Sequence, residues 1–122
     1  MESPFKGKTG IRRVLNAFVY SMDGLRAAYK NEDAFRQEVL LAVLMIPAAC
    51  LLPVSMLGRA LMIASVLLVL IVELLNSAIE AAIDRISLDH HRLSKRAKDI
   101  GSAAVFIALL NVVVVWSCVL IN

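Results

Sequence analysis

The stretch from 60 to 85 reads ALMIASVLLVLIVELLNSAIEAAIDR, and its two halves differ in character. From Ala60 to Val72 every side chain except Ser65 is apolar, as in a helix that crosses hydrocarbon. The second half adds polar side chains three, four and four residues apart: Glu73, Asn76, Glu80 and Asp84. On a helix this spacing forms one narrow stripe. Because an ionised carboxylate in lipid is costly, the stripe must face protein, water or a cation.

The composition extends this prediction to the whole chain. Of its 122 residues, 60% are hydrophobic, and the mean hydropathy is +0.77. A soluble chain of this length cannot bury so much apolar surface. We therefore predict an all-α integral membrane protein with one membrane domain, 1–122. Its elements are predicted at 11–30 (surface helix) and, as transmembrane helices, at 34–52, 57–86 and 94–121.

The segment 11–30 has a different pattern from the three spans. Its apolar residues recur every three or four positions, and basic residues occupy most of the other face. Beside membrane spans, this pattern favours an amphipathic helix lying in the interface plane; the alternative is a bundle helix of a soluble protein. Asn31 is predicted to cap the helix that follows, with Glu32 and Asp33 in its first turn.

Lysine and arginine indicate the orientation. Residues 1–38 contain seven, residues 85–98 contain five, and the connection at 53–59 contains only Arg59. The positive-inside rule then places the N-terminus and the 87–98 loop in the cytoplasm and the C-terminus on the outer side. Three short helices offer one subunit little interior for the polar stripe, so we expect an oligomer.

The stripe has two interpretations. It is either a polar clamp between helices or part of a functional site that opens to the cytoplasm. The second is favoured because the other spans bring ionisable groups to the same interface: Glu32, Glu38, Lys98 and Asp99. Several carboxylates and a lysine are suited to Mg²⁺ and a polyphosphate. His90 and His91 are adjacent, which does not suit a zinc site, and nothing indicates a nucleic-acid partner.

Three segments together resemble the small integral-membrane diacylglycerol kinases of bacteria: NEDAFRQE (31–38), VELLNSAIEAAIDR (72–85) and RAKDIGSAAV (96–105). The resemblance implies a homotrimer in the bacterial inner membrane, with a surface helix and three spans per subunit. It also implies transfer of the γ-phosphate of MgATP to the hydroxyl of diacylglycerol, which gives phosphatidic acid.

The resemblance further implies roles for individual residues. Glu73 resembles the general base for the lipid hydroxyl, and Asn76 matches a position that orients Glu73 or the acceptor. Glu32 and Glu80 resemble metal ligands that also meet the nucleotide. The other implied nucleotide contacts are Arg13, Tyr20, Asp89, His90, His91, Lys98 and Asp99. The implied lipid contacts are Arg13, Glu73 and Ser102.

Other functions remain as alternatives. An undecaprenol kinase of the same family would share the motifs at the reacting centre. A small proton-coupled exporter also carries an intramembrane glutamate, but four spans with the glutamate near the membrane centre would favour it more. A non-enzymatic membrane subunit would leave the acids on three helices without a purpose.

Overall fold

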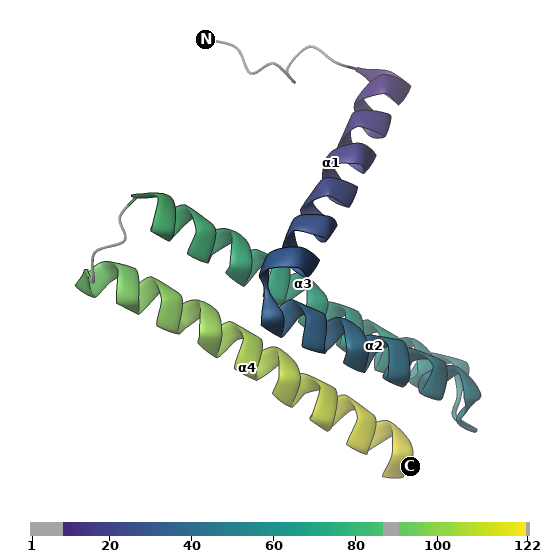
Figure 1. Ribbon diagram of the computed structural model, residues 1–122. Coiled ribbons are helices and arrows are strands. Elements are labelled where there is room, and N and C mark those ends of the chain that lie inside the picture. Colours follow the sequence, from purple (N-terminus) through teal and green to yellow (C-terminus); the bar gives the residue numbers. More distant parts are fainter. Residues whose placement is uncertain (1–8, 87–90, 122) are drawn as a thin grey trace. The chain divides into compact units, whose positions relative to one another are not determined.

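Figure 1 shows the computed structural model, which describes residues 9–86 and 91–121. These residues form four helices: α1 (Gly10–Asn31), α2 (Asp33–Leu51), α3 (Met56–Ile86) and α4 (Arg92–Ile121). The predicted all-helical class is confirmed, and each helix ends within two residues of its predicted bounds. The chain divides into two compact units, 1–32 with α1 and 33–122 with α2 to α4, which are described separately below.

In the first unit, α1 ends where Glu32 takes an extended backbone conformation, with φ −118° and ψ 108°. The Glu32 backbone N–H still donates to the Ala28 carbonyl at 2.9 Å. The prediction that Asn31 caps the next helix is wrong. Asn31 is the last residue of α1, and its side-chain Nδ2 donates to the Ala27 carbonyl at 2.9 Å. The side-chain amide therefore bonds a carbonyl of its own helix, one turn back.

The three helices of the second unit are each long and apolar enough to cross a membrane. At about 1.5 Å per residue, the 19 residues of α2 extend ~28 Å, close to the ~30 Å of a hydrocarbon core. The 31 residues of α3 and the 30 of α4 extend ~45 Å. These two helices therefore have several turns to spare. Most of their charged residues lie in the turns where α3 ends and α4 begins, and the exceptions are Arg59 in the first turn of α3 and Glu73 in its interior.

The helices α2 and α3 are joined by a short turn at 52–55, which we call the turn end of the unit. Arg59 stabilises this turn: its Nε donates to the Ala49 carbonyl at 3.0 Å, and its Nη2 donates to the Leu52 carbonyl at 3.1 Å. These carbonyls lie at the C-terminal end of α2, where no helical N–H remains to bind them. The single arginine of the connection is thus held by backbone oxygens.

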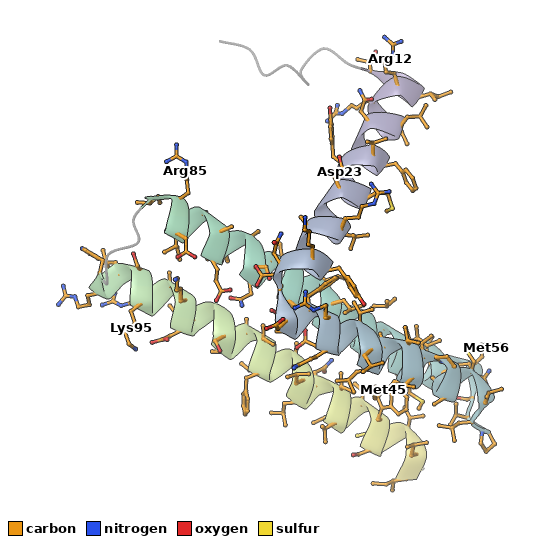
Figure 2. The ribbon with its side chains drawn as sticks, viewed as in Figure 1. Arg12, Asp23, Met45, Met56, Arg85 and Lys95 are labelled. Carbon is orange, nitrogen blue, oxygen red and sulfur yellow. The ribbon has the colours of Figure 1, made fainter. Side chains whose placement is uncertain are left out.

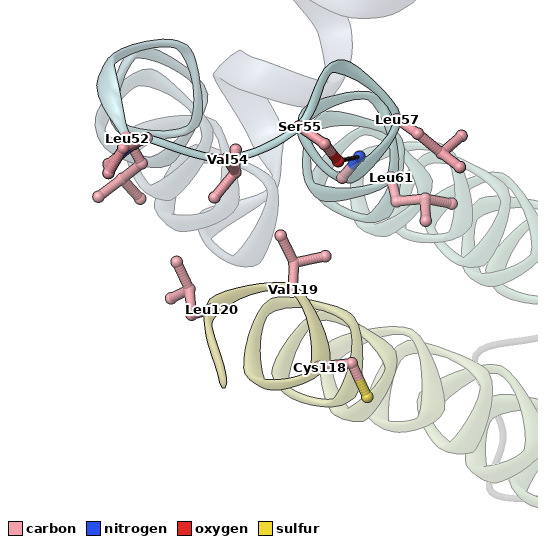
Figure 3. A pocket seen from close by; sticks show the side chains of 10 residues that line it. Leu52, Val54, Ser55, Leu57, Leu61, Cys118, Val119 and Leu120 are labelled. Carbon is pink, nitrogen blue, oxygen red and sulfur yellow. Dashed lines mark hydrogen bonds between the residues drawn. The ribbon is translucent and has the colours of Figure 1, made fainter. Parts of the chain in front are cut away.

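The first turn of α3 is capped by a side chain. Ser55 Oγ accepts a hydrogen bond from the Gly58 N–H at 3.0 Å, drawn in Figure 3. The side chains drawn in Figure 3 belong to the turn, α3 and the end of α4, and they line a cavity at the turn end. Its volume is about 550 Å³. Val119 lies against Gly58, and a Cβ there would come within 2.9 Å of Val119 Cγ1. Gly58 therefore allows the end of α4 to approach α3 closely.

One face of α3 forms a packing seam along the second unit, where α3 contacts both α2 and α4. The buried residues of this seam are Gly58, Met62, Ser65, Val66, Val69, Glu73, Asn76 and Ser77. Trp116 of α4 adds a polar link, because its Nε1 donates to the Met62 carbonyl at 3.2 Å. The seam is small and apolar toward the turn end. It becomes polar toward the opposite end, which we call the loop end, where α3 finishes at Ile86 and α4 begins at Arg92.

Much of the apolar surface of the spans remains exposed in the single chain. Large side chains such as Phe106, Ile107 and Val113 are exposed along α4. Lipid or further copies of the chain can cover such surfaces. Cys50 and Cys118 lie in apolar runs, a position that predicts free, buried thiols. They are free, but both are exposed, because they lie on outward faces of their helices.

Candidate active site

Two polar side chains of the seam are deeply buried between the helices. Glu73 is 4% exposed and Asn76 is 8% exposed. Both continue the three-and-four spacing of the apolar seam residues, so the same packing that buries Met62 and Val69 also buries them. The stripe that the sequence predicts therefore begins inside the packed unit.

A second buried carboxyl meets Glu73 from α2. Glu38 is 9% exposed, and its side chain shares a hydrogen bond with that of Glu73. A hydrogen bond between two carboxyl groups requires a proton on one of them. The two helices therefore place two carboxyl groups within hydrogen-bonding reach of each other, an arrangement that suits proton transfer.

Sequence reasoning placed Glu38 near the site but gave it no role. The signal that could have found it is its distance from the turn. Glu38 lies 14 residues before residue 52 and Glu73 lies 18 residues after residue 55, so an antiparallel hairpin brings them to within about one helical turn of each other along the helix axes.

Three polar atoms around this pair are buried and have no hydrogen-bond partner within the described residues. They are Glu38 Oε2, Asn76 Oδ1 and Ser77 Oγ. Leaving a buried polar atom unpaired costs about 1–3 kcal/mol. Such costs are tolerated mainly where the polar groups have a purpose other than packing. The region around Glu73 is thus the least satisfied part of an otherwise regular helix packing.

The stripe continues toward the loop end into more accessible surroundings. Glu80 is half-buried, and Asp84, one turn further, is exposed. Lys98 of α4 crosses to α3, where its Nζ binds Asp84 Oδ1 at 2.8 Å, and it lies within electrostatic range of Glu80. The structure therefore places Lys98 within electrostatic range of Glu80, and their role in holding phosphates stays a prediction. Asp84 belongs to the predicted stripe, but no individual role was predicted for it.

Asp99 and Ser102 are the other predicted site residues on α4, and neither contacts Asp84 in the way that Lys98 does. Asp99 binds Lys95 across one helical turn, with Oδ2 and Nζ 2.7 Å apart, and Ser102 is exposed. Figure 2 shows Lys95 and Arg85 at the loop end, on α4 and α3 respectively. The loop end is therefore rich in basic groups.

The remaining predicted contacts are distributed differently. His91 is exposed, and its Nδ1 accepts a hydrogen bond from the Leu93 N–H at 3.0 Å, so it caps the start of α4. Asp89 and His90 lie outside the described residues. Arg13 and Tyr20 are exposed on α1 in the first unit, which also contains Glu32. Their predicted approach to α3 and α4 stays a prediction.

Comparison with known proteins identifies the family. A family model described as prokaryotic diacylglycerol kinase matches residues 19–120. A diacylglycerol kinase of Pseudomonas aeruginosa is 61% identical over 120 residues, which cover 98% of each chain. One of Escherichia coli K12 is 54% identical over 113 residues, covering 93% of this chain and 92% of the relative. A more distant one, of Helicobacter pylori, is 43% identical over 115 residues, covering 94% and 89%.

The chain belongs to the prokaryotic diacylglycerol kinase family. The resemblance seen in the sequence is thereby confirmed. Together with the three apolar helices, membership indicates a bacterial membrane protein.

A kinase of this family needs a nucleotide and usually a divalent metal. Among the described residues, no three His, Cys, Asp or Glu side chains gather into a metal-binding group. The donor chemistry nevertheless fits Mg²⁺, which typically takes one or two carboxylates and completes its shell with phosphate oxygens and water. Glu80 is such a carboxylate: it is half-buried and lies within electrostatic range of Lys98.

Proposed function

We propose that this protein transfers the γ-phosphate of MgATP to the hydroxyl of 1,2-diacylglycerol, which gives phosphatidic acid and ADP. The proposal rests on family membership and, within the molecule, on one observation. Glu73, which is buried against Glu38 of α2, lies on one stripe of α3 with half-buried Glu80 two turns away and with exposed Asp84, which binds Lys98 of α4, three turns away. A lipid hydroxyl and a water-borne nucleotide need this combination of a buried and an accessible end.

Glu73 is proposed as the general base. Its carboxylate takes the proton from the lipid hydroxyl while the hydroxyl oxygen forms a bond to the γ-phosphorus. The bond from that phosphorus to the bridging oxygen of ADP breaks at the same time. Burial of Glu73 keeps bulk water away from the acceptor, so hydrolysis of ATP competes less with transfer. Asn76, one turn along the seam, orients Glu73 or the acceptor.

The nucleotide is proposed to bind at the loop end. Lys98 would exchange its bond to Asp84 for the phosphates, as a mobile point charge. Glu80, together with Glu32, would hold Mg²⁺, which when bound neutralises charge on the phosphates. Arg13, Tyr20 and Asp99 would contact the nucleotide, with Asp89 to His91 nearby. Ser102 and Arg13 would contact the lipid.

The assembly and orientation complete the proposal. We propose a homotrimer in the inner membrane, with α1 lying in the cytoplasmic interface, the N-terminus cytoplasmic and the C-terminus periplasmic. The exposed apolar face of α4 supports an assembly, and the basic loop end supports this orientation. Native mass spectrometry of the detergent-solubilised protein tests the trimer. Protease access to tags at each terminus in sealed vesicles tests the orientation.

The activity is tested with purified protein in mixed micelles that contain MgATP and one of two lipids, diacylglycerol or undecaprenol. We expect labelled phosphatidic acid as the main product. A strong preference for undecaprenol would keep the catalytic residues but refute the proposed acceptor. Absence of transfer to either lipid from a correctly assembled protein would refute the enzymatic function and return the exporter and the non-enzymatic subunit as interpretations.

A further inference from the structure

Gly101 of α4 lies directly against the side chain of Asn76. Gly101 is buried, and a Cβ built on it would overlap Asn76 Oδ1 and come within 3.2 Å of Asn76 Cγ. No other described glycine approaches a side chain of the candidate site in this way. Gly10 and Gly24 face open space, and Gly58 meets Val119 and Ser55 at the turn end.

The contact matters because no hydrogen bond within the described residues holds the Asn76 amide oxygen. Asn76 is 8% exposed, and its Oδ1 is buried without a hydrogen-bond partner among the described residues. An amide with an unpaired oxygen is not oriented by that atom through hydrogen bonding. On the α4 side, the surface that limits movement of this oxygen is the backbone of Gly101.

We propose that Gly101 is a positioning residue for phosphoryl transfer: its bare Cα sets the conformation of the Asn76 amide one turn from Glu73. The inference rests on the proposed roles of Glu73 and Asn76. A methyl group added at this glycine would push the Oδ1 end of the Asn76 side chain away from α4. Because the displaced group is the end of a side chain and not backbone, the helices can keep their packing while the amide moves.

The experiment compares Gly101→Ala with Gly58→Ala. Both substitutions place a methyl group in a tight α3–α4 contact within a helix, but only the first meets Asn76. We expect Gly101→Ala to lower kcat at least about tenfold and to leave both KM values within about twofold. We expect its melting temperature to fall no further than that of Gly58→Ala, which keeps wild-type kcat. Equal kcat values for the two variants would overturn the inference.

Asn76→Ala separates this inference from the proposed function. If Asn76→Ala loses activity while Gly101→Ala matches Gly58→Ala, the inference is wrong and the site stands. If Asn76→Ala keeps full kcat, the role of Asn76 is wrong and the inference falls with it.

A double variant covers the case in which Gly101→Ala fails to assemble. Truncating Asn76 to alanine removes the atoms that the methyl group added by Gly101→Ala would overlap. We therefore expect Gly101→Ala to leave the melting temperature unchanged when added to Asn76→Ala. Equal destabilisation by Gly101→Ala in the presence and absence of the Asn76 side chain would show a purely structural role for Gly101 and overturn the inference.

Discussion

Replacement of Arg59 by methionine should loosen the turn end without altering catalysis. The arginine makes two good hydrogen bonds, of 3.0 Å to the Ala49 carbonyl and 3.1 Å to the Leu52 carbonyl. A third contact, to the Val54 carbonyl at 3.5 Å, is too long to count for much. Hydrogen bonds from a charged donor contribute about 1.5–3 kcal/mol each, so the pair contributes about 3–6 kcal/mol before water replaces part of it. Because Arg59 is only partly buried, we expect a net loss of about 2–4 kcal/mol.

This loss is measurable as a melting temperature. For a chain of this size, 1 kcal/mol corresponds to roughly 3–5 °C, so Arg59→Met should melt about 6–20 °C below wild type in the same detergent. Arg59→Lys keeps the charge but not the fork of donors, and it should lose about half as much. Glu73 lies 14 residues along α3, or ~21 Å, so kcat at 25 °C should stay within about twofold of wild type. A melting temperature within about 2 °C of wild type would refute the stabilising role. A large fall in kcat at unchanged stability would refute its separation from the site.

Three further predictions concern the site. Glu73→Gln keeps the shape of the side chain but removes the base, so kcat should fall at least about 100-fold while native mass spectrometry shows wild-type assembly; near-full turnover would refute the base. Glu38→Ala removes the carboxyl that bonds Glu73, so kcat should fall about tenfold, with a smaller change in either KM. An unchanged kcat would show that the pair has no catalytic importance. Lys98→Ala should raise the KM for MgATP about tenfold. The control Arg96→Ala removes a charge from an exposed position on the same helix and should leave this KM unchanged. An effect of Lys98→Ala on the lipid KM alone would refute its nucleotide role.

The stripe on α3 was predictable because it depends on local periodicity. Spacings of three and four residues put Glu73, Asn76 and Glu80 on one face of any helix, whatever packs against it. Which partners they meet depends on the other helices. The bond between Glu38 and Glu73 needs the antiparallel hairpin of α2 and α3, and the bond between Lys98 and Asp84 needs α4 beside α3.

Errors in the sequence analysis arose where one residue had two local options. Asn31 has the chemistry of an N-cap, but as the last residue of α1 it donates to a carbonyl of its own helix. For Arg59 the sequence predicted no partner, because only the closeness of the turn to the end of α2 brings backbone carbonyls to its guanidinium.

By itself the sequence determined the class of the protein, its helices and its family. Apolar runs of membrane length and a three-and-four spacing of polar groups are properties of a single helix, so they need no knowledge of its neighbours. The tertiary structure alone decided which groups touch: Glu38 against Glu73, Gly101 against Asn76, and Arg59 against the end of α2. Such contacts depend on the axial register of one helix against another, and a shift of one residue, about 1.5 Å, would exchange the partners.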